Sequence, residues 1–196
     1  MIVEALLIGL LIGILRNGRL DNLADTQFRG VLLVILSFLL QLTPSIITRF
    51  GIAGDWLKYF PFAGVVLIAI VVVLNLNKQG AWIILIGVLL NMAAMAINGF
   101  LMPVDFASLD MAGLGELAAT IKDGAVINYI SSDQAVTWSN LIGKFIPVPK
   151  PYPFPKILSP GDIIISLGIL FMIQGEMNRA MFKRRGTMVQ FTYRSR

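Results

Sequence analysis

Five continuous apolar runs limit the folds open to this chain more than any other feature. They cover residues 2–15, 30–48, 60–76, 81–101 and 160–177, with at most two charged side chains in each. A bilayer leaves no water to satisfy backbone polar groups, and a helix satisfies them within one segment. A transmembrane barrel would instead show alternating strands of about ten residues. The continuous runs therefore predict an all-α membrane protein with five transmembrane helices.

The overall composition agrees with lipid as the main solvent of the chain. Hydrophobic residues make up 57% of the sequence and charged residues 14%, whereas soluble domains average about 45–50% and about 25%. The run at 2–15 is short for a span of roughly 20 residues. No basic segment precedes it and no small-residue cleavage pattern follows it. We therefore interpret it as a retained helix, and residues 1–196 as a single integral membrane domain.

The distribution of basic residues predicts the orientation in the membrane. Ten of the 16 Lys and Arg residues lie in segments 16–29 and 75–80 and in the tail at 178–196. Cytoplasmic segments are enriched in basic residues, so we expect the N-terminus outside and the C-terminus in the cytoplasm. The net charge of +5 then reflects membrane topology rather than binding to nucleic acid. The expected partners are membrane lipids and, if the chain is a subunit of a membrane assembly, the other subunits of that assembly.

The long segment at 102–159, between the fourth and fifth runs, is too large for a plain connector. Ser108 precedes an apolar pattern of fourfold spacing, and Ser131 and Gln134 have the spacing of a capping box. We expect two short helices that lie on the outer face of the bundle.

A proline-rich stretch closes this outer loop. Prolines occupy every second position from Pro147 to Pro155. Each proline fixes its own φ and restricts the residue before it. The nine residues would reach on the order of 28 Å in polyproline II form. We expect an extended strut across the top of the bundle, ending at the start of the last helix.

Polar side chains at membrane depth are the best available candidates for a functional site. Gln41 lies in the second run, and Asn91 and Asn98 lie seven residues apart in the fourth, on one helix face. Ser159-Pro160-Gly161-Asp162 begins the fifth run. Pro is favoured at the first helical position, and an acid at the third helical position completes a capping box. Asp162 is therefore a helix cap, with Ser159, or a residue that binds ligand.

The residue inventory restricts the chemistry of any site. The chain contains no Cys and no His, so thiolate nucleophiles, His bases, Ser-His-Asp triads and Cys/His metal sites are excluded. No nucleotide-binding or metalloprotease motif is present. The sequence predicts no catalytic residues, no metal site and no cofactor, and it leaves the question of enzymatic activity open, more in favour of none.

Three stretches, GRLDNLAD, INGFLMPV and IPVPKPYPFPKILSPGDIIISLGI, occur in this order along the chain. Together they resemble a family of small bacterial integral membrane proteins catalogued only as a domain of unknown function. The resemblance covers essentially the whole chain. It implies five helices with a large loop between the fourth and fifth, in the bacterial cell membrane, and it implies no activity.

The resemblance gives weight to particular positions: Gly18, Arg19, Leu20, Asn98, Gly99, Met102, Pro103, Val104, Gly161 and Asp162. Related sequences tend to have a second Gly where this chain has Phe100, and an apolar residue in place of Pro160. They often carry an Asp just before the Ile-Pro pair, where this chain reads Lys144-Phe145.

Three functions are compatible with the sequence. The first is an accessory or scaffold subunit of a membrane assembly, because no catalytic constellation is present. The second is a binder or transporter of a lipid or small amphiphile, with Asn91, Asn98 and Asp162 lining a cavity under the outer loop. The third is an enzyme acting on a lipid headgroup, with carboxylates as acid and base. Glu4 and Asp162 are the acids nearest the outer helix ends.

Overall fold

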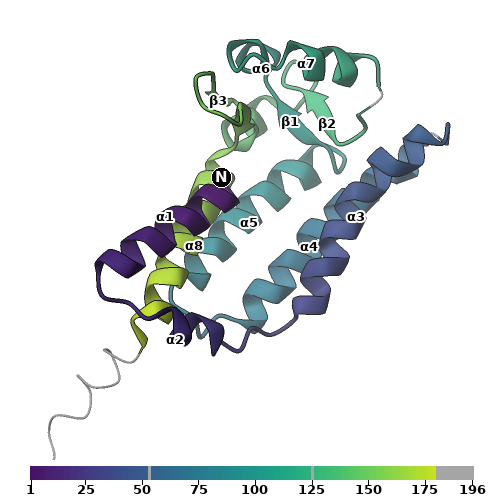
Figure 1. Ribbon diagram of the computed structural model, residues 1–196. Helices are drawn as coiled ribbons and strands as arrows, with labels where there is room; N and C mark the ends of the chain where they lie inside the picture. Colours follow the sequence, from purple (N-terminus) through teal and green to yellow (C-terminus); the bar gives the residue numbers. More distant parts are fainter. Residues whose placement is uncertain (53, 125, 180–196) are drawn as a thin grey trace, which may run out of the picture.

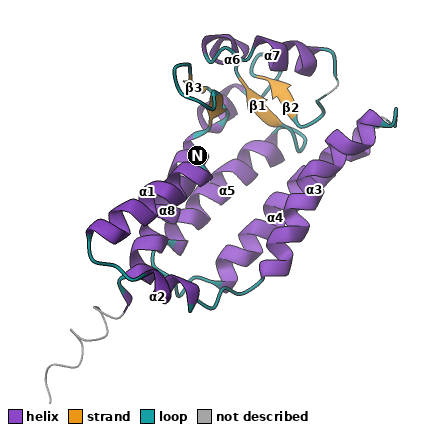
Figure 2. Cartoon of the chain, in the orientation of Figure 1, coloured by secondary structure: helices purple, strands orange, loops and turns teal. Residues whose placement is uncertain are grey.

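The computed structural model describes residues 1–52, 54–124 and 126–179, and most of this chain is helical (Figures 1 and 2). The α-helices are α1 (Ile2–Leu15), α2 (Leu20–Ala24), α3 (Val31–Arg49), α4 (Tyr59–Leu74), α5 (Ala81–Ile97), α6 (Phe106–Met111), α7 (Gly115–Lys122) and α8 (Pro160–Met177), with 3-10 helices η1 (Asp55–Lys58) and η2 (Thr137–Ile142). The strands are β1 (Met102–Val104), β2 (Tyr129–Ser131), β3 (Ile146–Val148) and β4 (Lys156–Leu158).

Long apolar helices make up the body of the molecule, as the hydropathy predicts. Among the described residues, three helices are long and apolar enough to cross a membrane: α3, the continuous η1–α4 segment and α8. The apolar helices α1 and α5 are shorter, at 14 and 17 residues. The predicted run at 81–101 ends as a helix at Ile97, because Gly99 and Phe100 adopt φ values of 65° and 72°. This left-handed conformation ends a helix and favours glycine.

The five apolar helices run side by side, with α8 packed against both α1 and α5, and with α3 packed against α4 (Figure 1). The helix α2, the loop at 75–80 and the end of α8 lie together at one end, which we call the α2 end. Residues 102–124 and 126–159 form a small folded unit at the opposite end, which we call the cap. Of the basic tail predicted at 178–196, only Asn178 and Arg179 belong to the described residues.

Glycines allow α8 to lie close to both of its neighbours. A methyl group added to Gly13 of α1 would lie 2.2 Å from Met177 Sδ, and one added to Gly87 of α5 would lie 2.6 Å from the carbonyl oxygen of Gly161. Small residues at such crossings let helix backbones approach and gain van der Waals contact, which drives helix association in lipid.

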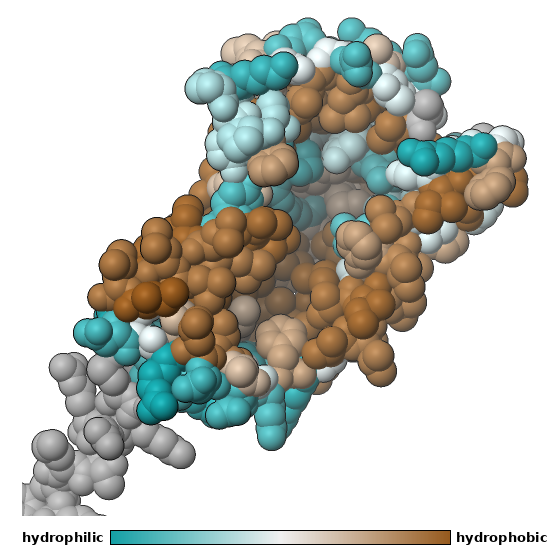
Figure 3. Space-filling model, viewed as in Figure 1, coloured by the Kyte–Doolittle hydropathy of each residue, from teal (hydrophilic) through white to brown (hydrophobic). Residues whose placement is uncertain are grey.

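The apolar side chains divide between an interior and an exposed surface. The bundle interior contains Ala81, Ile84, Val88, Ile169 and Ile173, and the cap has its own core of Val104, Leu109, Ala118, Ile121 and Ile157. Large apolar side chains elsewhere are exposed, such as Leu32 at 80% and Phe38 at 61%. Figure 3 shows such a surface over α1 and over the α3–α4 pair, with a hollow between them below the cap.

The cap differs from the two predicted helices. The segment predicted as the first helix forms two separate helices, α6 and α7, because the chain turns between them at Gly113, whose φ is 73°. The N-cap of α6 lies before Ser108: it is Asp105, whose carboxylate accepts a hydrogen bond from the Ser108 backbone N–H at 2.9 Å. The predicted capping box at Ser131 is wrong, since Ser131 ends β2, which pairs in parallel with β1. The segment that follows is the 3-10 helix η2.

The proline-rich stretch is a hairpin rather than an extended strut. Strand β3 pairs with β4 in antiparallel register, with Pro147 opposite Ile157. The chain reverses between them, where the Tyr152 N–H donates to the Pro149 carbonyl at 3.2 Å. An antiparallel pair takes hydrogen bonds from alternate residues of each strand. Prolines at every second position are thus compatible with a strand, a possibility that the strut prediction did not include.

Candidate functional site

A cluster of polar side chains lies where the cap meets the helices, and we call Asn91, Lys144, Ser159 and Asp162 the cap-end cluster. Asp162 is its centre. Its carboxylate accepts hydrogen bonds from Asn91 Nδ2 at 2.9 Å, from Lys144 Nζ at 2.8 Å and from the Ser159 N–H at 3.1 Å. Three elements therefore meet at one carboxylate: α5, the segment before β3 and the start of α8.

The local sequence of α8 sets the position of this carboxylate. Ser159 is the N-cap, and its Oγ accepts a hydrogen bond from the Asp162 N–H at 3.0 Å, while Asp162 bonds back to the Ser159 backbone. This is the capping box expected from Ser-Pro-Gly-Asp. Ser159 Oγ also donates to Asn91 Oδ1 at 2.7 Å. Asp162 therefore has two roles, since it caps α8 and also accepts the hydrogen bond of Lys144.

Lys144 is the member of the cluster that sequence reasoning did not assign. Its backbone is fixed to the cap, where its N–H donates to the Pro103 carbonyl at 2.8 Å. Burial is the largest single influence on the pKa of Lys144 and lowers it, but the attraction of Asp162 and Tyr129 together with the hydrogen bond to Asp162 leaves the pKa raised. Lys144 and Asp162 are 18 residues apart without a recognisable motif, so charge balance around Asp162 was the one available signal.

Two cavities adjoin the cap-end cluster. The larger, of about 900 Å³, lies between α1, the start of α8 and the cap, including the β3–β4 hairpin of the cap, and its wall includes Leu7, Leu117 and Ile165. The smaller, of about 200 Å³, includes Gln41 of α3 and Asn91 of α5. The side chains that line both cavities are Tyr129, Lys144 and Asp162. The ion pair of Lys144 with Asp162 thus lies at the wall of the larger cavity, whose other lining residues are mainly apolar.

A second polar group lines the larger cavity and ties α1 to the hairpin. The Glu4 carboxylate accepts hydrogen bonds from the Tyr152 hydroxyl and from Lys156 Nζ. The hydrogen bond to Glu4 is the largest cause of the raised pKa of Tyr152. Burial alone would lower the pKa of Lys156, but the hydrogen bond to Glu4 raises it. No local signal in the sequence pairs Tyr152 with Glu4, because the two residues are 148 positions apart.

The remaining predicted candidates occupy different surroundings. Gln41 lies on the far wall of the smaller cavity, and its Nε2 donates to Ser37 Oγ at 3.1 Å within α3. Asn98 is buried, with 7% of its surface exposed. Its amide donates to Ser139 Oγ at 2.8 Å and accepts from the Val136 N–H at 2.9 Å. Asn98 therefore anchors η2 of the cap to the end of α5, and it lines neither cavity.

Comparisons with known proteins place the chain among relatives without an assigned role. The model of a protein family described as "Family of unknown function (DUF5317)" matches residues 25–174. An uncharacterized protein of Thermotoga maritima is 27% identical over 169 residues, which cover 86% of this chain and 88% of that protein. No solved structure gives a significant match.

Proposed function

The chain belongs to the family of unknown function DUF5317, and on that premise we propose that it binds a lipid or another small amphiphile in the larger cavity beneath the cap. The observation that carries this proposal is the composition of the cavity wall. Apolar side chains make up most of it, and two ion-paired groups stand at its polar edge: Lys144 with Asp162 and Lys156 with Glu4.

The size and chemistry of the cavity support an amphiphilic ligand. Small-molecule sites are typically of about 300–1,000 Å³ and mainly apolar, with a few polar groups that fix orientation. The cavity of about 900 Å³ falls in this range. Val3 and Leu7 of α1 line it while 65% and 63% of their surfaces are exposed. In a bilayer these side chains would face lipid, so an acyl chain has a route into the cavity from the membrane.

The test is the identity of what copurifies with the protein. Native mass spectrometry of the protein from gently solubilised membranes should show one bound amphiphile. Leu117→Trp adds bulk to the cavity wall and should abolish the bound species. The matched control is Leu141→Trp, because Leu141 is 72% exposed on η2 and lies outside the cavity. A wild-type protein without a ligand, or equal retention by both variants, would refute the proposal.

An accessory or scaffold role is the second candidate, favoured by the apolar surface of α3. Only 11% of an apolar 18-residue stretch of α3 is buried. The side chains of Leu32, Phe38 and Leu39 are at least half exposed. A partner helix would cover such a surface as well as lipid does. Copurification of a stoichiometric membrane protein, lost in Phe38→Ala, would support this role, and a stable monomer would oppose it.

An enzyme using Glu4 and Asp162 as acid and base is the weakest candidate. Both residues line the larger cavity, but the oxygens of each carboxylate already accept hydrogen bonds from a lysine of the cap. Among the described residues, no hydrogen bond joins the carboxyl group of Glu4 to that of Asp162.

We also propose that all five apolar helices cross the bacterial cell membrane, with the cap outside and the α2 end in the cytoplasm. The clustering of basic segments at the α2 end supports this orientation. The chain contains no Cys, so single-cysteine variants report one position each. An impermeant maleimide applied to intact spheroplasts should label Gln134→Cys in the cap and spare Asn77→Cys. The reverse pattern would overturn the orientation.

A further inference from the structure

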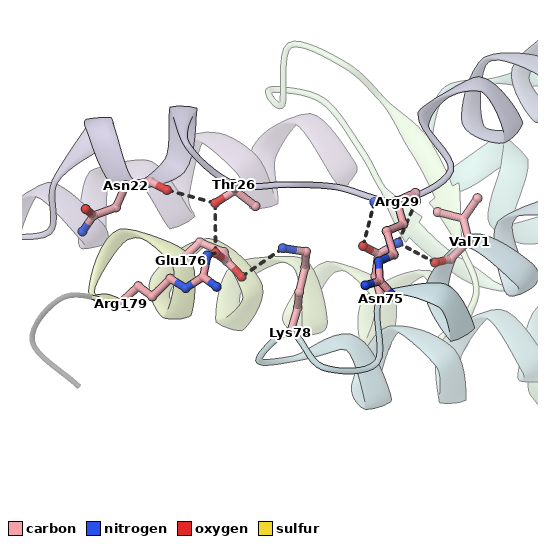
Figure 4. Close-up of polar contacts among 8 residues, drawn as sticks. All are labelled: Asn22, Thr26, Arg29, Val71, Asn75, Lys78, Glu176 and Arg179. Atoms are coloured by element: carbon pink, nitrogen blue, oxygen red, sulfur yellow. Dashed lines mark hydrogen bonds and ion pairs between the residues drawn. The ribbon is translucent and has the colours of Figure 1, made fainter. Parts of the chain in front are cut away.

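A second polar cavity lies at the opposite end of the molecule from the cap. It has a volume of about 290 Å³ and is lined by Asp25, Arg29, Asn75, Asn77, Lys78 and Arg179, together with Gln27. These residues belong to the segment before α3, to the loop between α4 and α5, and to the chain just after α8; Figure 4 shows Arg29, Asn75, Lys78 and Arg179 among them. None of its residues lines either cavity at the cap.

Asn75 fixes one side of this cavity. Its side chain, with 2% of the residue exposed, accepts a hydrogen bond from the Arg29 N–H at 3.0 Å. It donates to the Arg29 carbonyl at 2.8 Å and to the Val71 carbonyl at 2.8 Å. The backbone of Arg29 is thereby tied to the end of α4, which sets the place from which its guanidinium extends (Figure 4).

Glu176 fixes the other side. Its carboxylate accepts hydrogen bonds from Thr26 Oγ1 at 2.9 Å and from Lys78 Nζ at 3.3 Å, and Arg179 NH1 lies 3.6 Å from it (Figure 4). Lys78 and Glu176 are each 8% exposed. A buried ammonium is costly unless it is paired, so Glu176 explains how Lys78 is held at the wall of the cavity.

The charges around the cavity do not cancel. Arg29, Lys78 and Arg179 carry three positive charges, whereas Asp25 and Glu176 carry two negative charges. One positive charge is therefore left for a ligand. Guanidinium groups present a planar fork of donors that matches phosphate oxygens, and a phosphodiester carries one negative charge.

The surroundings of the cavity indicate which class of phosphate-bearing molecule would bind there. Immediately after Arg29 and Gly30, α3 begins with Val31 and Leu32, which are 52% and 80% exposed. A phosphate bound between Arg29 and Arg179 would lie at the end of this apolar helix, with space for acyl chains along it. We propose that the α2-end cavity binds the phosphodiester headgroup of an anionic phospholipid.

Lipid titration followed by native mass spectrometry tests this site. We expect the protein to retain one dioleoyl phosphatidylglycerol with an affinity at least about tenfold higher than for dioleoyl phosphatidylcholine. Arg29→Gln combined with Arg179→Gln should weaken binding of phosphatidylglycerol by at least about tenfold, because two charged hydrogen-bond donors are lost. The matched control is Arg16→Gln combined with Arg19→Gln, which removes the same charge at the same end outside the cavity and should change binding less than about threefold.

Two further arms separate this site from its alternatives. Leu117→Trp changes the wall of the larger cavity beneath the cap and should leave binding of phosphatidylglycerol unchanged. This variant therefore distinguishes failure of the proposed function, which concerns the larger cavity, from failure of the site at the α2 end. Millimolar inorganic phosphate should not displace the lipid; displacement would identify a site for a free anion and overturn the proposal. Equal affinity of the wild-type protein for the two lipids would also overturn it, even if the arginine variants do not fold.

Discussion

Gly161 gives the sharpest test of the packing between α5 and α8. A methyl group at this position would lie 2.2 Å from Asn91 Oδ1 and 2.7 Å from the Gly87 carbonyl oxygen. Both distances are far below van der Waals contact, and the second atom belongs to backbone that cannot rotate away. Gly161→Ala must therefore separate the two helices or displace Asn91 from Asp162 and Ser159.

The magnitude follows from two opposing effects. Overpacking of a well-packed interior costs about 1–3 kcal/mol, and loss of an interhelical hydrogen bond in a membrane protein costs about 0.6 kcal/mol. Ala is favoured over Gly in a helix interior by about 0.8–1.0 kcal/mol, and by less here because Gly161 lies in the first turn of α8. The clash outweighs the propensity, and we expect a net loss of about 1–3 kcal/mol.

The assay is unfolding in mixed micelles, followed by circular dichroism as the fraction of sodium dodecyl sulfate rises. Gly115→Ala is the matched control, because Gly115 begins a helix of the cap and a methyl group there would have no contact closer than 3.6 Å. Adding Asn91→Ala to Gly161→Ala should recover part of the loss, since one of the two clashes is removed. A Gly161→Ala protein as stable as the Gly115→Ala control would refute the close approach of α5 and α8.

Two further predictions concern the attachment of the cap. Asn98→Leu removes the hydrogen bonds to Ser139 and Val136 and should cost about 1–3 kcal/mol because buried partners are left unpaired; hydrogen exchange should then quicken in η2 while α3 is unchanged, and uniform exchange would contradict the anchoring role. The raised pKa of Lys144 means that its ion pair with Asp162 stabilises the fold fully below its unfolded pKa of about 10.4, and that this contribution is lost as the pH rises through the folded value. The stability difference between the wild type and Lys144→Met should accordingly be constant from pH 7 to about pH 9.5 and shrink above that range, and a difference that grows with alkalinity would contradict this assignment.

The sequence predicted the apolar helices well, because hydropathy and capping are local. The predicted start of the last helix at Pro160 and its end near Met177 agree with α8, and the capping residues Ser159 and Asp162 lie only three positions apart in the chain. The end of α5 was predicted four residues too late. The apolar run continues to Leu101, and hydropathy alone does not mark the turn of the chain after Ile97. Phe100 adopts a positive φ, at a position where the resemblance to the family implies Gly.

The sequence predicted the site only in part, because its contacts join distant segments. Asn91 and Asp162 were both candidates, and the structure brings them together, but their partner Lys144 was counted only as a loop charge. The hairpin at β3 and β4 was missed because the alternating prolines predicted an extended polyproline strut, and the pairing of β3 with β4 depends on the reversal of the chain between them. The pairing of Glu4 with Lys156 links residues 152 positions apart, and no local pattern reports such a contact.

The packing of α1 against α8 has a consequence for how the protein is made. Of the five apolar helices, α1 precedes the other four in the chain but packs against α8, the last of the five, with Gly9 and Gly13 lying against Ile173 and Met177. The α3–α4 pair joins helices that follow each other directly in the chain and can assemble early. Contacts between such distant segments are slow to form, so we expect the α1–α8 contact to form later than the α3–α4 contact, once α8 has been synthesised.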